Sequence, residues 1–394
     1  MFQSRRITTM GGDKFRDEHS LAFDGTNDYV TLGNNLNLGT GDFSFAFWVK
    51  VNDDFNLNYF FSKYQQEEDR WYFRANASDP PKLHFYSKTS DTERLSMTGS
   101  AGLDDYLGKW VHIAMSVDRG TSVSFYINGQ LDVTHTGVTQ TNSDSLDNTG
   151  GFHISKYSST YANQNISELA YYNTALSASQ VATIYNGREP YNHKEGIASG
   201  NLQAWYRMGD GRLDSFGYNG VIGDETDSLV GTNLVANGDM ETSGGTATGG
   251  GTAIANWSDQ SSPSTRERNS TKAHSGTYSC KFTPSSSSDG IKSDNFTSAA
   301  AVYKISFWVY PDDSQNVTWK FLEHDTTAHT GDISDLTQDE WNYVEFYAIS
   351  SSAGGNASLA IMNSSETSGD WYIDDVSVKK LGGYPGIMTN MTAD

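Results

Sequence analysis

The sequence predicts an all-β protein built from two β-sandwich domains in tandem. Short runs rich in Val, Ile, Phe, Tyr and Trp recur between Gly, Asn, Asp and Ser turns, and long helical patterns are almost absent. The chain has 394 residues, of which 36% are hydrophobic and 13% aromatic, which is enough for two or three domains with apolar cores. Layered sheets are the usual way to bury such strands.

The elements of the first domain follow one another in a clear order. We expect strands within "LAFDGTNDYVTLG" (21–33), "GDFSFAFWVKV" (41–51), "RWYFRANASDPPKLHFYSK" (70–88), "GKWVHIAMSVDRGTSVSFYINGQLDVTHTG" (108–137), "GFHISKY" (151–157) and "QNISELAYYN" (164–173). Asn128-Gly129 is typical of a type I′ hairpin turn. A helix is predicted within the stretch 176–187, with Ser177 as its N-cap and Gly187 just after its end.

The second domain begins after a junction. We place an N-terminal arm at 1–20, the first domain at 21–190, the junction at 191–231, the second domain at 232–380 and a C-terminal tail at 381–394. Strands are expected within 277–282, 302–310, 316–325, 341–349, 357–363 and 370–378. An alternative leaves residues 200–231 and 381–394 as parts of one interrupted unit.

Charge and motifs exclude several functions. The net charge of −21 argues against nucleic acid or an anionic membrane as partner. The single Cys280 allows no disulfide within the chain, and we recognise neither a membrane span nor a secretory signal. His324, Asp325 and His329 lack the spacing of a zinc helix, and no strand carries the closely spaced acids of a glycosidase. We therefore expect a protein that is not an enzyme.

The first domain resembles the laminin-G-like, concanavalin-type jelly-roll family. The motifs are "FDGTNDYV", "FSFAFWVK", "GKWVHIAMSVD", "VSFYINGQL" and "ISELAYYNTALSASQVATIYNG". The resemblance implies a sandwich fold and a binding or adhesion role. An acidic pair commonly precedes the last strand in that family, whereas this chain has Ser167-Glu168, so a cation site is not carried over.

The second domain resembles a carbohydrate-binding-module jelly roll. The motifs are "NLVANGDME", "HSGTYSCKF", "YKISFWVY" and "WYIDDVSV". The resemblance implies a structural Ca²⁺ ion held by Glu241 and Asp374, with Asp239 beside it. Alternation in the last strand would place Asp374 on the apolar face with Tyr372, Val376 and Val378. The alternative is a buried Asp374 that accepts backbone N–H groups.

Aromatic side chains in this domain suggest a sugar-binding surface. Alternation in 302–310 sends Tyr303, Ile305, Phe307 and Val309 to the core and leaves Trp308 and Tyr310 on the opposite face. The same pattern in 341–349 places Glu345 and Tyr347 on that face. The interpretation is a carbohydrate site made of Trp308, Tyr310, Glu345 and Tyr347, and the alternative is that these rings belong to a core.

Together with the closing "GYPGIMTNMTAD", these features resemble structural proteins of tailed bacteriophages. We therefore expect a non-enzymatic virion surface protein of the head-fibre, decoration or tail-fibre type. It would be made in the host cytoplasm, form a homo-oligomer, contact other virion proteins and bind host or environmental glycans. The alternative is a secreted or cell-surface bacterial adhesin or polysaccharide-binding protein.

Overall fold

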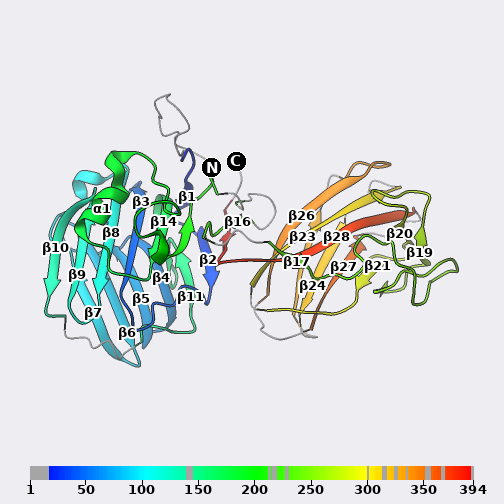
Figure 1. Cartoon of the computed structure of the whole chain (residues 1–394), viewed down its shortest axis with the longest axis horizontal. Helices are drawn as coiled ribbons and strands as arrows, with labels where there is room; N and C mark the ends of the chain where they lie inside the picture. The colour runs from blue at the N-terminus through cyan, green and yellow to red at the C-terminus, as the bar shows by residue number, and fades with distance from the viewer. Residues whose placement is uncertain are drawn as a thin grey trace. The chain divides into compact units, whose positions relative to one another are not determined.

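A computed structural model describes residues 17–138, 145–211, 214, 220–226, 230–299, 301–312, 317–323, 327–333, 336–350, 356–364 and 369–391. The chain divides into two compact units, the first made of Met1–Ser228 and Gly382–Asp394, the second of Leu229–Leu381 (Figure 1). The prediction of an all-β fold is confirmed, because both units are built from antiparallel sheets. Within the described ranges, no helix is long and apolar enough to cross a membrane.

The first unit contains two large sheets. One has the order β1 (Leu21–Asp24), β14 (Asn163–Tyr172), β3 (Phe43–Val51), β8 (Val111–Asp118), β9 (Ser122–Ile127) and β10 (Gln130–Thr136), with β15 (Leu202–Tyr206) paired to β14. The other has the order β16 (Val221–Ile222), β29 (Gly386–Thr389), β2 (Tyr29–Gly33), β11 (Gly151–Ile154), β4 (Tyr59–Gln66), β5 (Asp69–Ala75), β6 (Leu83–Thr89) and β7 (Thr92–Thr98). A small ribbon joins β12 (Lys156–Tyr157) to β13 (Thr160–Tyr161).

Phenylalanine side chains fill the core between these two sheets. The rings of Phe45 of β3 and Phe61 of β4 are tilted at 44° with centroids 4.7 Å apart, and Phe47 meets Phe73 of β5 edge to face. A second apolar cluster, which includes Val181 and Ile184, packs helix α1 (Ala178–Tyr185) onto the outer side of the first sheet.

The predicted turn and helix signals are confirmed in this unit. Asn128 and Gly129 both have positive φ, as a type I′ turn requires. The Ser177 side chain accepts the backbone N–H of Gln180 in a capping box at the start of α1. The described residues of this unit also form three short 3-10 helices: η1 (Asp104–Tyr106), η2 (Asn186–Arg188) and η3 (Ser199–Asn201).

Most of the residues assigned from sequence to a junction and a tail are instead parts of the first unit, whereas 229–231 and 381 belong to the second. Strand β15 pairs with β14, and β29 lies between β16 and β2 in the second sheet (Figure 1, red). The sequence assignment of 191–231 and 381–394 is corrected accordingly, because these short strands bury Val221 and Ile222 and complete a sheet. The alternative of one interrupted unit is the arrangement that the structure shows. The second unit is therefore an insertion in the first.

The N-terminal arm is corrected in part. Asp17 and Ser20 are buried in the first unit, so the end of the arm belongs to the folded domain. Residues 1–16 lie outside the described residues.

The second unit is a separate sandwich. One sheet has the order β19 (Thr265–Asn269), β20 (Ser279–Thr283), β28 (Trp371–Leu381), β23 (Ala301–Pro311) and β26 (Asn342–Ser350), with β17 (Val230–Asn233) paired to β28. The other has the order β18 (Trp257–Gln260), β21 (Gly290–Ser293), β27 (Asn356–Asn363), β24 (Val317–Glu323) and β25 (Thr327–Ile333), with β22 (Phe296–Thr297) paired to β27. Cys280 is buried in this core, as expected.

The predicted core face of β23 is confirmed. Tyr303, Ile305, Phe307 and Val309 are all buried in the apolar cluster of the second unit. The alternate residues, which include Trp308 and Tyr310, are only partly buried on the outer face of the same sheet. Strand periodicity therefore assigns both faces of β23 correctly.

Candidate functional site

A β-bulge in strand β28 decides where Asp374 points. Ile373, Val376 and Val378 lie in the core, whereas Asp375 has a φ of 50° and shifts the alternation by one residue. Tyr372 therefore packs on the outer face, against Tyr310, with ring centroids 6.0 Å apart. The predicted placement of Tyr372 and Asp374 on the apolar face was wrong, because simple alternation does not anticipate a bulge at a non-glycine residue.

Asp374 is nevertheless completely buried, with 0% of its surface exposed, because a loop covers it. Its Oδ2 accepts the backbone N–H groups of His274 at 2.9 Å and Ser275 at 3.2 Å, and its Oδ1 accepts that of Asp375 at 2.8 Å. Burial raises the pKa of Asp374 to about 6, and the charge of Asp375 adds to this effect, while the N–H donors oppose it.

Glu241 holds the other end of the same loop. Its Oε1 accepts the backbone N–H groups of Thr277 at 2.6 Å and Tyr278 at 2.8 Å. The two carboxylates that the sequence predicted to act together therefore both bind the loop 274–278. Together they fix this loop on the outer side of the sheet.

The described contacts of these acids do not fit a calcium site. Ca²⁺ needs six to eight oxygen ligands, but Asp374 and Glu241 face N–H donors. The Arg268 guanidinium donates to the carbonyls of Met240 and Glu241, which places a positive charge beside them. In the part of the chain that the structure describes, no three acidic, His or Cys side chains gather to hold a metal. This geometry matches the hydrogen-bonded alternative, and calcium binding stays a prediction.

The fixed loop places His274 on the predicted platform. The imidazole stacks on Trp308 with ring centroids 3.9 Å apart and an interplanar angle of 15°. Its Nδ1 lies 2.7 Å from Asp375 Oδ2, and the Ser275 hydroxyl donates to Asp375 Oδ1 at 2.7 Å. One face of Trp308 is therefore occupied by a side chain of the same domain.

Strand β26 supplies the exposed part of this surface. Tyr343 lies opposite Trp308 in the strand register and is 52% exposed. Its hydroxyl donates to Glu345 Oε2 at 2.6 Å, and Glu345 Oε1 lies 2.8 Å from Lys304 Nζ. Tyr347, by contrast, is only 4% exposed, which corrects its prediction as a sugar-contacting residue. Alternation indicates the side of the sheet but not what covers a side chain.

A second aromatic group surrounds Tyr310. Trp341 meets its ring edge to face at 5.7 Å, and Lys272 Nζ lies 3.9 Å from its centroid. Lys272 is in turn 2.6 Å from Asp312 Oδ1. We call the set Trp308, Tyr310, Trp341 and Tyr343 the aromatic face. Tyr372 is only 5% exposed and supports this face by packing against Tyr310.

The sequence analysis identified two of these four residues, Trp308 and Tyr310. Tyr343 was not chosen as a site residue, although the alternation that places Glu345 and Tyr347 on the outer face places Tyr343 there too. Tyr372 was assigned to the core because regular alternation does not include the bulge at Asp375. Trp341 lies just before its strand, where alternation gives no direction.

Part of the first unit is similar to a known family. Residues 24–182 match the family model of the concanavalin A-like lectin/glucanases superfamily. No curated protein sequence matches the chain.

Several solved structures resemble parts of the chain. Domain 4 of AbnA, an extracellular GH43 arabinanase from Geobacillus stearothermophilus, in complex with arabinotriose, is 19% identical, covering 47% of this chain and 87% of that one, with a TM-score of 0.30. A SAP-like pentraxin from Limulus polyphemus is 16% identical over 45% and 82%, with a TM-score of 0.33. The binding domain of Paraclostridial Mosquitocidal Protein 1 is 12% identical over 71% and 81%, with a TM-score of 0.35.

Proposed function

We propose that the protein is a non-catalytic glycan-binding protein on the virion surface of a tailed bacteriophage. The observation that carries the binding role is the aromatic face of the second unit, where rings and charged groups alternate on the outer side of one sheet. The alternative setting is the surface of a bacterial cell, as an adhesin or a secreted polysaccharide-binding protein.

The chemistry of this face suits sugars. The C–H-rich faces of pyranose rings pack on aromatic rings, and a few polar groups orient the hydroxyls. Tyr343 offers an exposed ring, while Glu345 and Lys304 beside it offer a hydrogen-bond acceptor and a donor. An open sheet face contacts the middle of a chain rather than enclosing one end, so we expect weak binding per site.

The carboxylates near this face support a role in binding rather than in hydrolysis. Glu345 is paired with Lys304, Asp312 with Lys272, and Asp375 with His274. A glycosidase needs one carboxyl free to donate a proton and another free to attack or to activate water. Paired carboxylates suit the positioning of rings and hydroxyls.

A virion setting would compensate for weak sites by multivalency. Many linked copies raise avidity by roughly a hundred- to ten-thousandfold without new contacts. The acidic composition and the resemblance of the sequence to phage structural proteins support this setting. Imaging the native assembly distinguishes the two settings, because a particle-bound protein supports the virion and a cell-bound one supports the adhesin.

The binding role is tested with Tyr343→Ala in the full chain, coupled at high density to beads and applied to a glycan array. Since Tyr343 is exposed, we expect an unchanged melting temperature and loss of the multivalent signal. Tyr384→Ala is the matched control, because Tyr384 is an exposed tyrosine of the first unit. Equal binding by the wild type and Tyr343→Ala, or no retention of any glycan by the wild type, would contradict the proposal.

A further inference from the structure

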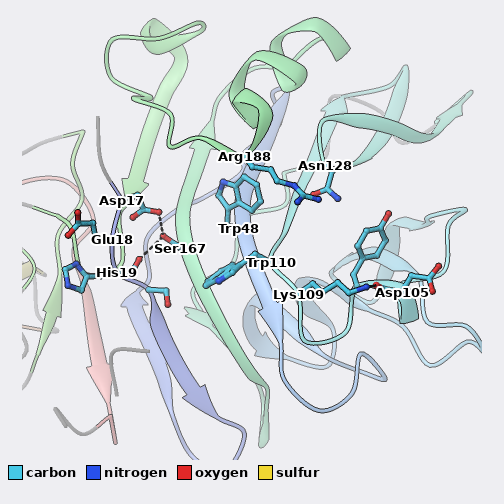
Figure 2. Close-up of a pocket in the computed structure, with 12 residues that line it drawn as sticks. Asp17, Glu18, His19, Trp48, Asp105, Lys109, Trp110, Asn128, Ser167 and Arg188 are labelled. Atoms are coloured by element: carbon cyan, nitrogen blue, oxygen red, sulfur yellow. Dashed lines mark hydrogen bonds between the residues drawn. The ribbon is translucent and has the colours of Figure 1, made fainter. Parts of the chain in front are cut away.

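The first unit contains a pocket that none of the sequence motifs indicated. Its volume is about 430 Å³, within the range of small-molecule sites. Its walls come from seven separate segments of the chain (Figure 2). The lining residues are Asp17, Glu18, His19, Ser20, Trp48, Asp105, Tyr106, Lys109, Trp110, Asn128, Ser167 and Arg188.

Aromatic side chains form the centre of this pocket. Trp48 of β3 is 6% exposed and is held by His112 and Tyr185, whose ring centroids lie 5.3 and 5.7 Å away. Trp110, just before β8, is half-buried, and Tyr106 of η1 lies in the same wall. The packing fixes the Trp48 ring before any ligand arrives, which lowers the entropy cost of binding.

One side of the pocket carries buried polar groups of low charge. Ser167 Oγ lies 3.0 Å from Asp17 Oδ2, and both residues are almost completely buried. Burial raises the pKa of Asp17 to about 10, and the nearby charges of Glu168 and Asp210 act in the same direction. These effects favour the uncharged carboxylic acid form of Asp17, which can both donate and accept a hydrogen bond.

The opposite side carries charged and polar groups. Figure 2 shows Trp48 and Trp110 between the Asp17–Ser167 pair and a rim that includes Asn128, Arg188 and Lys109. Lys109 Nζ donates to the Asp105 carbonyl at 2.8 Å, beside the Asp105 carboxylate. Across the whole pocket, Glu18 on the Asp17 side and Asp105 on the opposite side are set against Lys109 and Arg188, so neither sign of charge is in strong excess.

We propose that this pocket is a second ligand site, which binds the end of an uncharged oligosaccharide. Tryptophan faces suit the C–H surface of a sugar ring, and Ser167, Asp17 and Asn128 supply groups that can pair with hydroxyls. A hollow of this size encloses one chain end, whereas the aromatic face of the second unit is open. The inference stands independently of the proposed function, because the two surfaces belong to different units.

The experiment uses the full chain carrying Tyr343→Ala, so that the aromatic face is impaired and the two proposals fail separately. Isothermal titration calorimetry is run with neutral trisaccharides of glucose, galactose, mannose and xylose. We expect at least one of them to bind with one site per chain. Adding Trp110→Ala should weaken this binding at least about tenfold, and Trp110→Phe, which keeps a ring, should weaken it less. Tyr384→Ala, at an exposed tyrosine of the first unit that does not line the pocket, is the control and should leave the isotherm unchanged.

Two further measurements keep the inference refutable. If Trp110→Ala lowers the melting temperature of the first unit, Arg188→Ala replaces it, because Arg188 is exposed and should weaken the same isotherm without unfolding. Tetramethylammonium and a uronic acid trisaccharide are the charged probes. Absence of neutral-sugar binding, binding insensitive to both Trp110→Ala and Arg188→Ala, or tighter Trp110-dependent binding of a charged probe would each overturn the assignment.

Discussion

Replacing Asp374 by Asn tests the most unusual feature of the second unit, a buried carboxylate beneath a loop. Burial raises the pKa of Asp374 from 3.8 to about 6 in the folded state. At about 1.4 kcal/mol per pH unit, ionising this group in the folded protein costs about 3 kcal/mol more than in the unfolded chain.

The direction in which the free energy of unfolding changes with pH follows from proton binding to Asp374. Between about pH 4 and pH 6 the folded state holds the Asp374 proton and the unfolded state does not. The free energy of unfolding of the second unit should therefore fall by up to about 3 kcal/mol as the pH rises through this window, and change no further above it. Asp374→Asn removes this fall, because an amide does not titrate. The variant should also lose about 1–3 kcal/mol at every pH for an N–H group left without an acceptor.

Cys280 provides the assay. It is the single cysteine, is fully buried and lies in β20, so its reaction with a pyridyl disulfide reports unfolding of the second unit within the full chain. Urea midpoints are measured from pH 4 to pH 8 in the presence of a chelator, and the variant curve is subtracted from the wild-type curve. Titrating groups that do not interact with Asp374 cancel in this difference. A difference that stays constant with pH, or that grows in favour of the wild type as the pH rises, would refute the reasoning.

Two other predictions concern calcium and the chain ends. If Ca²⁺ binds Glu241 and Asp374, then Ca²⁺ at a hundredfold excess over its Kd should stabilise the second unit by about 2.7 kcal/mol at pH 7, as followed by the same thiol assay, and Asp374→Ala should show no response. A wild-type unfolding curve that is unaffected by Ca²⁺ would contradict calcium binding at these two residues. Deleting residues 382–394 should lower the melting temperature of the first unit, because β29 pairs with both β16 and β2, while the second unit keeps its urea midpoint. An unchanged first unit in the shortened chain would show that β29 contributes little to its stability.

Strand periodicity predicted much of this fold because it is a local property. The two faces of β23 followed from alternation alone, and the turn at Asn128-Gly129 and the cap at Ser177 followed from the conformations that these residues prefer. Each depends on neighbours in the chain, so no knowledge of the tertiary structure was needed.

The sites depended on non-local features that the sequence does not display. The bulge at Asp375 moves Tyr372 to the outer face, although a left-handed aspartate leaves no signature comparable to glycine. The pocket around Trp48 forms only when segments from residue 17 to residue 188 meet. Strand β29 is four residues long and pairs with β2, which lies more than three hundred residues earlier.

The insertion of one unit in another has a consequence for synthesis on the ribosome. Residues 229–381 of the second unit are continuous and emerge before β29, so this unit can finish folding first. During that time β2 has no partner on the side that β29 later occupies, and it presents unpaired N–H and C=O groups. The first unit therefore keeps this unpaired sheet edge while all the residues of the second unit are synthesised. Association between nascent chains through this edge would be the characteristic failure of its folding.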